Sequence, residues 1–514
     1  MANGNKACGG LWLATQFNAE PFGGLTVRSY IGTNRRTSEA GGRVTETYPP
    51  QMNPGDTAAE HLNFHIRHEP VNLELLARVF EASGPQFVQD WVNSKPTSQY
   101  ARRGAFLYEF LTGEELVAPV GVKGNYVNAL DGSKNLASRL LFEKIRDPKW
   151  KVLNNMPGTR FFCPALPLTK ELIRASAYDI PRHYEEIIDE FGIELLARSA
   201  SWLTTRESTA SFAIEKEVGE TNRIQRFAQV IATWTGHDVP PSQRTDDAGD
   251  IRLASKGILS DQRLASLQKA ILGDSAFITH HGYRKSPVFL GQKSHYSQVV
   301  HYLAPPAEDV AAMLEGIETF LDRTRFQSPV LRAAIASFGF VYVHPLSDGN
   351  GRVHRFLIND ILRRDGATTE DIILPVSVAI NANQTSRREY DQVLDTISAP
   401  LMGEIRADIS FSDSPQTYPD GVESDLVFGD NDRARPTWRY GNYVPHVIYM
   451  AKVIDTTIVH HMRDEAIYLR NHDNARLALK EIAEMPDPIT DKVIRSVTEN
   501  NAESVGNKLR KQVS

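Results

Sequence analysis

The stretch at 344–355, His-Pro-Leu-Ser-Asp-Gly-Asn-Gly-Arg-Val-His-Arg, constrains the fold of this chain more than any other feature. Gly349 and Gly351 let backbone N–H groups converge on an anion, because a side chain there would block close approach. The next segment, 352–364, carries apolar residues on its faces and is followed by Gly366, which predicts a buried helix. The Gly-Asn-Gly turn therefore lies at a helix N-terminus, where free amides and the helix dipole favour phosphate.

The side chains of this stretch suit a polyphosphate held beside a proton acceptor. His344 has an ordinary pKa near ~6.5, so it can take a proton from a hydroxyl at neutral pH. Asp348 is a hard oxygen ligand for Mg²⁺, and Asn350 can donate its amide to a phosphate oxygen. Arg352 and Arg355 are three residues apart on one helix face, so both guanidinium groups can clamp the same ligand.

Apolar spacing predicts two more helices, one through 310–321 after Pro306 and one over 329–343. The segment 283–291 predicts a short β-hairpin or an extended flap. A fourth helix is predicted over 204–219, with two residues of one face four positions apart, Ser211 and Glu215. Its signals are a capping box and a C-cap glycine, formed by Thr204, Glu207 and Gly219.

The stretch at 344–355 resembles the signature of the Fic (fido) family, His-Pro-Phe-x-Asp-Gly-Asn-Gly-Arg-x-x-Arg, with Leu346 in place of Phe. The resemblance covers roughly 265–405, and the Pro-Gly-Thr-Arg run at 157–160 resembles the N-terminal extension of larger bacterial members. It implies a mainly α fold. We therefore expect a Fic-type helical bundle with a small β-hairpin flap and helical N- and C-terminal flanking regions.

The resemblance also implies an enzyme, a protein adenylyltransferase that uses ATP and Mg²⁺. It would transfer AMP to a Ser, Thr or Tyr hydroxyl of a target protein or of the chain itself. His344 would be catalytic and Asp348 the metal ligand, and Gly351 favours nucleotidyl transfer because the kinase-like Doc branch carries Lys there. For Tyr390 a core aromatic is an equal alternative. The implied nucleotide-binding residues are Val288, Phe289, Leu290, Gly291, Asp348, Gly349, Asn350, Gly351, Arg352, Val353, His354, Arg355, Tyr390 and Ser398.

Ser211 and Glu215 resemble the family's inhibitory motif, Ser/Thr-x-x-x-Glu-Gly/Asn. The resemblance implies that Glu215 pairs with Arg355 and displaces the γ-phosphate. Lys216 departs from the Gly or Asn of the motif, and a solvated helix face is the alternative. Two other functions stay open. One is a deAMPylase in which the same Glu orients a water, and the other is a regulatory or interaction protein with a vestigial nucleotide site.

Composition sets the remaining expectations for this chain of 514 residues. A net charge of −6 argues against a dedicated nucleic-acid binder. Two distant cysteines imply no disulfide framework, and no membrane span or signal peptide is apparent, so we expect a cytoplasmic protein. Whether it forms a homodimer is left open. The predicted regions are a partly irregular N-terminal region at 1–116, a mainly helical extension at 117–256, a Fic catalytic domain at 257–408, a linker at 409–436 and a C-terminal helical region at 437–514.

Overall fold

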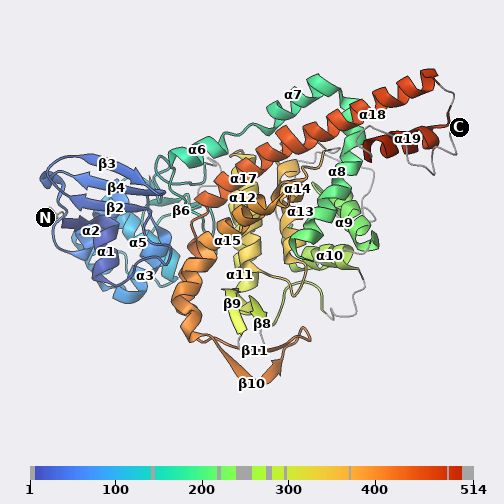
Figure 1. The fold of residues 1–514 in the computed structure, drawn as a ribbon. Helices are drawn as coiled ribbons and strands as arrows, with labels where there is room; N and C mark the ends of the chain where they lie inside the picture. The colour runs from blue at the N-terminus through green and yellow to red at the C-terminus, as the bar shows by residue number, and fades with distance from the viewer. Residues whose placement is uncertain are drawn as a thin grey trace, which may run out of the picture.

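The computed structural model describes residues 6–139, 145–216, 221–238, 257–273, 280–293, 298–369, 372–482 and 485–499. The fold is mainly helical with a few small sheets, as the sequence predicted. Figure 1 shows an N-terminal unit at one end, a helical bundle in the middle and a long C-terminal helix that crosses above the bundle. Among the described residues, no helix is long and apolar enough to cross a membrane.

The N-terminal unit is a four-stranded sheet covered by helices, where the sequence predicted a partly irregular region. The strands, in the order β1-β2-β4-β3, are β1 (Lys6–Cys8), β2 (Val27–Ile31), β4 (Arg43–Tyr48) and β3 (Arg36–Ala40). The helices are α1 (Gly9–Gln16), α2 (Ala58–His68), α3 (Leu73–Ser83), α4 (Gln86–Ser94) and α5 (Gln99–Thr112). A capping box between Thr57 and Glu60 starts α2, and Asn72 caps α3. The apolar sides of these helices form a core of their own.

A connecting region leads from this unit to the bundle. It holds three short strands, β5 (Val127–Asn128), β6 (Ile145–Asp147) and β7 (Val152–Asn154), and the helices α6 (Lys170–Ser176), α7 (Ile180–Phe191), α8 (Ile193–Ile214) and α9 (Thr221–Trp234).

The helix predicted over 204–219 is α8, and its predicted caps were wrong. It begins eleven residues before Thr204 and ends at Ile214. The Thr204 hydroxyl donates to the carbonyl of Ala200 one turn earlier, as a threonine inside a helix can, so Thr204 does not cap the helix. Glu207 bonds to Ser377 of another helix. The predicted C-cap, Gly219, lies outside the described residues.

The bundle is built on two helices that are buried on nearly every side, α12 (Pro329–Val343) and α13 (Asn350–Arg364). Around them lie α10 (Asp261–Leu272), α11 (Val310–Arg323), α14 (Val376–Ile380) and α15 (Gln384–Ile405). The predicted flap forms a hairpin, although its strands β8 (Phe289–Lys293) and β9 (Gln298–Leu303) lie somewhat later than 283–291. The helix predicted over 329–343 has the predicted bounds.

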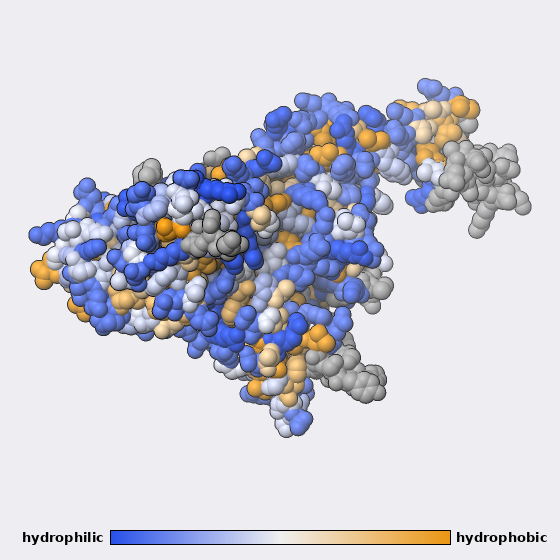
Figure 2. Space-filling view, turned by 60° about the vertical axis from the view of Figure 1, so that its left-hand side comes forward, coloured by the Kyte–Doolittle hydropathy of each residue, from blue (hydrophilic) through white to orange (hydrophobic). Residues whose placement is uncertain are grey.

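The segment predicted to be a linker, 409–436, holds a second hairpin and the start of a helix. The hairpin consists of β10 (Ser410–Thr417) and β11 (Glu423–Val427), and α16 (Asn431–Tyr440) follows. After it, α17 (Val444–Thr456), a π-helical turn (Thr457–Met462) and α18 (Arg463–Ile482) run on without a break, and α19 (Asp487–Glu499) packs against α18. Figure 2 shows a largely hydrophilic surface with apolar side chains gathered at the projecting end of α18 and α19, where Ile482 is exposed.

Candidate active site

The 344–355 loop joins the two central helices through two left-handed residues. His344 ends α12 with φ +50, and its N–H donates to the carbonyl of Phe340 over 2.9 Å. Gly349 begins α13 with φ +88, a conformation that glycine adopts without strain. His344 has a Cβ, so the loop holds it in a conformation that L-residues seldom take. Such a conformation persists only where the surroundings enforce it.

Two buried side chains that the sequence did not single out brace this loop. Arg284, which follows α10 and precedes the flap, donates from Nε to the carbonyl of His344 over 2.7 Å. Its other nitrogens donate to the carbonyls of Ser286, over 2.8 Å, and Pro305, over 2.5 Å. Gln268 of α10 donates to the carbonyl of Asp348 over 2.9 Å. The flap, α10 and the loop are therefore fixed relative to one another.

Asn350 also braces the loop. Its Nδ2 donates to the carbonyl of Leu346 over 2.7 Å, and its Oδ1 accepts from the N–H of Leu346 over 3.0 Å. The sequence predicted that this amide donates to a phosphate, whereas here it closes a ring with the loop backbone. Asn350 is almost fully buried, so the loop's shape depends on this pair of bonds.

The imidazole of His344 is arranged to act as a base. Its Nδ1 lies 3.2 Å from the carbonyl of Val341, and a carbonyl can only accept a hydrogen bond. Nδ1 therefore carries the proton, and the lone pair is on Nε2. Burial, together with the charge of Arg284, lowers the pKa of His344 to about 4. The ring is thus neutral at physiological pH.

Glu215 lies between the two arginines of the loop. Its Oε2 is 3.0 Å from Arg352 Nε, and its Oε1 is 2.5 Å from Arg355 Nη2. Arg355 Nε also donates to Ser211 Oγ over 2.6 Å. Both arginine side chains are buried, and the Glu215 side chain is only 22% exposed. The sequence predicted the pairing of Glu215 with Arg355, and the structure adds Arg352.

The fit of Glu215 depends on the residues next to it. A Cβ on Gly351 would lie 2.3 Å from Glu215 Oε1, so only glycine leaves room for this carboxylate. Glu215 is the C-cap of α8, and Lys216 follows with φ +58. This is the left-handed region that glycine and asparagine favour. Position 216 therefore has the backbone conformation that favours the Gly or Asn of the motif, although Lys occupies it here.

Asp348 fits the role of a ligand to a metal that arrives with a nucleotide. Its side chain is 50% exposed, and one oxygen accepts from the N–H of Gly349 over 2.6 Å. Mg²⁺ in nucleotide sites is commonly held by one or two carboxylates together with the phosphates. In the part of the chain that the structure describes, no group of three or more His, Cys, Asp or Glu side chains is gathered to hold a metal.

Four residues predicted to contact nucleotide lie in the helical core. Val353 and His354 are fully buried on α13, and His354 Nδ1 is 2.8 Å from the carbonyl of Ser337. Tyr390 is buried with its ring centroid 6.3 Å from that of His354, and Ser398 donates to the carbonyl of Leu394 within α15. Helical periodicity explains the first two, because residues one and two positions after Arg352 face away from its side.

The flap residues predicted to border the nucleotide are on or beside strand β8. Val288 accepts from the N–H of Ala304, and Phe289 packs edge-on against Phe411 of the second hairpin at 5.5 Å between centroids. Leu290 is exposed, and Gly291 lies against β9, where a Cβ would be 2.5 Å from the carbonyl of Val299. Strand β8 of the flap is therefore held by β9 on one side and contacts the second hairpin through Phe289.

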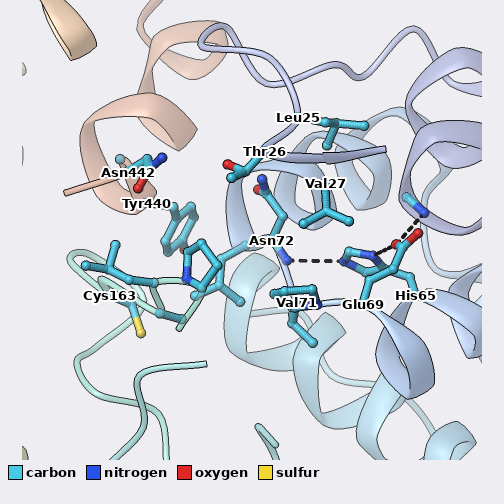
Figure 3. Close-up of a pocket in the computed structure, with 17 residues that line it drawn as sticks. Leu25, Thr26, Val27, His65, Glu69, Val71, Asn72, Cys163, Tyr440 and Asn442 are labelled. Atoms are coloured by element: carbon cyan, nitrogen blue, oxygen red, sulfur yellow. Dashed lines mark hydrogen bonds and ion pairs between the residues drawn. The ribbon is translucent and has the colours of Figure 1, made fainter. Parts of the chain in front are cut away.

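A cavity of about 50 Å³ between the N-terminal unit and the bundle is separate from this site. Figure 3 shows it between Tyr440 and a buried His65–Glu69 pair. The N–H of Asn72 donates to His65 Nε2, so His65 Nδ1 donates to Glu69, which also accepts from the N–H of Gly10 at the start of α1. No residue of the 344–355 loop lines this cavity.

Comparison with known proteins matches residues 258–362 to the Fic/DOC family. The protein adenylyltransferase Fic of Drosophila mojavensis is 29% identical over 116 residues, 22% of this chain and 21% of the relative. The protein adenylyltransferase fic-1 of Caenorhabditis elegans is 24% identical over 216 residues, 41% of this chain and 40% of the relative. The chain thus covers less than half the length of these curated relatives.

Solved structures of similar proteins are also Fic proteins. A Fic family protein from Desulfovibrio desulfuricans G20 is 19% identical, with a TM-score of 0.35 over 65% of this chain and 81% of that one. Fic-1 from Caenorhabditis elegans is 17% identical, with a TM-score of 0.30 over 81% of this chain and 99% of that one. From the family match and the signature loop, we conclude that this chain carries a Fic/DOC family domain over residues 258–362.

Proposed function

We propose that the chain is a protein adenylyltransferase that transfers AMP from ATP to a Ser, Thr or Tyr hydroxyl of a target protein or of itself. The observation that carries this proposal is the arrangement around Glu215. The Glu215 carboxylate forms ion pairs with two buried arginines at the N-terminus of α13, beside a neutral imidazole. Two guanidinium groups and a helix N-terminus form a site for a polyphosphate, and an acidic side chain is its natural competitor.

In the proposed step, His344 Nε2 accepts the proton of the target hydroxyl. The hydroxyl oxygen then bonds to the α-phosphorus, and the bond from that phosphorus to the bridging oxygen breaks, so that pyrophosphate leaves. Arg352 and Arg355 would hold the outer phosphates, where negative charge gathers as the bond breaks. Asp348 would hold Mg²⁺, which offsets the charge of the phosphates.

Glu215 restrains this activity by holding the arginines in place of the γ-phosphate. An ionic hydrogen bond of this kind contributes about 1–3 kcal/mol, which corresponds to roughly ten- to a hundred-fold in nucleotide affinity. The test is incubation of purified wild type, Glu215→Gly and His344→Ala with labelled ATP, Mg²⁺ and a cell lysate. We expect more labelled protein with Glu215→Gly than with wild type, and none with His344→Ala. Equal labelling by all three would overturn the proposal.

The reverse reaction is a second candidate, and one observation favours it. The charge of Glu215 opposes part of the fall in the His344 pKa, so the two side chains act on the same site, where a water that attacks a phosphodiester could be held between them. In that case a pre-modified protein would release AMP with wild type, and Glu215→Gly would release none. The two reactions thus respond in opposite ways to the same substitution.

A further inference from the structure

Helix α8 presents a buried polar seam to the bundle. The carboxyl and hydroxyl side chains of Glu207, Ser208 and Ser211 are fully buried, and Glu215 follows one turn later. Each of the first three bonds to a different helix. Glu207 reaches α14, Ser208 donates to the carbonyl of Ile224 on α9, and Ser211 accepts from Arg355 on α13. The seam thus connects α8 to α14, α9 and α13, three of the helices that pack against it.

Of these residues, Glu207 depends most on its hydrogen-bond partners, because its carboxyl group is fully buried. Its Oε2 accepts from the N–H of Ser377 over 2.7 Å, and its Oε1 accepts from Ser377 Oγ over 2.5 Å. Burial raises the pKa of Glu207 to about 7, and the bonds to Ser377 and the nearby charge of Arg355 oppose that rise. A buried carboxyl group without such partners is expensive, so Glu207 is compatible with only one arrangement of α8 against α14.

This requirement fixes the register of the helix. A shift of α8 by one residue would turn its faces by about 100° and leave the Glu207 carboxyl buried without its donors. Ser211 and Glu215 lie one and two turns further along the same face. The bonds between Glu207 and Ser377 therefore also fix where Glu215 lies relative to the two arginines.

We propose that Glu207 is a positioning residue of the restraint. Its bonds to Ser377 set the rotation and axial position of α8, and they thereby deliver Ser211 and Glu215 to Arg355 and Arg352. The inference rests on the proposed restraint of AMP transfer by Glu215. It assigns a function to a buried carboxyl group that has no part in the transfer step itself.

The test is a double-mutant cycle. Glu207→Ala and Glu207→Gln are each made in the wild type and in the Glu215→Gly background, and AMP transfer and the KM for ATP are measured. We expect Glu207→Ala to raise transfer roughly ten-fold and to lower the KM, because the register is no longer specified. Glu207→Gln should stay near wild type, since its carbonyl can accept from the Ser377 N–H and its amide can donate to Ser377 Oγ. In the Glu215→Gly background, Glu207→Ala should produce no further rise.

Two controls separate positioning from general destabilisation. Glu194→Ala makes the same substitution in the exposed first turn of α8 and should change nothing. Ser377→Ala deletes only the partner's hydroxyl and should raise transfer in the same direction as Glu207→Ala. If Glu207→Ala does not fold, the Ser377→Ala cycle with Glu215→Gly decides the question.

The outcomes distinguish the inference from the proposal beneath it. If Glu215→Gly releases transfer and neither Glu207→Ala nor Ser377→Ala does, the positioning role is wrong and the restraint stands. If the effects of Glu207→Ala and Glu215→Gly multiply, Glu207 acts by another route and the inference is again wrong. If Glu215→Gly itself releases nothing, the proposed restraint fails first. Hydrogen exchange across α8 provides a readout that is independent of activity, and it should quicken in Glu207→Ala and not in Glu207→Gln.

Discussion

Lys216 takes a backbone conformation that its own Cβ disfavours. Its φ of +58 lies in the left-handed region, where an L-residue other than Gly or Asn costs about 1 kcal/mol or more. We predict that Lys216→Gly stabilises the C-terminal turn of α8 by up to about 1 kcal/mol, because the strain disappears and only part of the gain is offset by the freer unfolded chain. Hydrogen exchange of that turn should slow, and AMP transfer by the otherwise unaltered chain should fall. Lys216→Ala keeps the Cβ, so it should gain nothing.

His344 determines how the reaction responds to acid. Its pKa is lowered to about 4 by burial and by Arg284, so the ring remains a neutral base well below the ordinary histidine range. We predict that single-turnover AMP transfer by Glu215→Gly shows no loss between pH 8 and about pH 5.5, and that it falls as the pH approaches 4. A rate that halves near pH 6.5 would show that the base is not this half-buried imidazole.

At the scale of single residues, the sequence predicted which side chains gather but not how the loop holds them. His344 and the two arginines were named from the stretch at 344–355, and Glu215 from its resemblance to the family's inhibitory motif; the structure brings them together. Arg284 and Gln268 were missed, because an arginine that satisfies backbone carbonyls leaves no periodic or compositional signal. Asn350 was assigned to phosphate, since sequence cannot show that its amide is already used by Leu346.

Helices show a similar division. The bounds of α12 were predictable because an apolar run lies between a Pro at its start and a turn at its end. The start of α8 was not, since Thr204 and Glu207 imitate a capping box inside a longer helix. A capping box is recognised from four consecutive residues, whereas Ser377, the actual partner of Glu207, lies 170 positions away in the sequence. Tertiary contacts therefore override such signals.

Glu207 also makes the docking of α8 depend on pH. Its pKa is about 7 in the folded chain, above the ordinary glutamate value of 4.5, so the docked helix binds the proton more tightly than the undocked one. The contribution to docking is therefore full below about pH 4.5 and is lost as the pH rises through 7. We predict that wild-type AMP transfer rises between pH 6 and 8 beyond any rise seen in Glu207→Gln, which cannot ionise. Parallel profiles in the two proteins would contradict this prediction.

At the scale of the whole molecule, the described residues form two large apolar cores, one in the N-terminal unit and one in the bundle. The four-stranded sheet beside the first core was not predictable as such, because strands of three to six residues are too short for alternation to stand out from loop composition. The bundle was predictable through its long amphipathic helices and through the signature. The continuous helix formed by α17, the π-helical turn and α18 runs across the bundle. Its α17 part packs against α12, and its α18 part packs against α8.

Buried neutral histidines make the bundle core sensitive to acid. Burial lowers the pKa of His354 and of His446 to about 3, against about 6.5 in an unfolded chain. Between these values the unfolded state binds more protons, so the free energy of unfolding falls as the pH drops from about 6.5, by about 2 kcal/mol per histidine at pH 5. His446→Gln keeps a partner for Tyr342, whose hydroxyl is 2.8 Å from His446 Nε2, and removes one titrating group. We predict that urea unfolding at pH 7.5 and pH 5.0 shows a smaller loss of stability for His446→Gln than for wild type. His301→Gln, at an exposed position on β9, should lose as much as wild type, and an equal loss in all three proteins would mean that other groups set the acid limit.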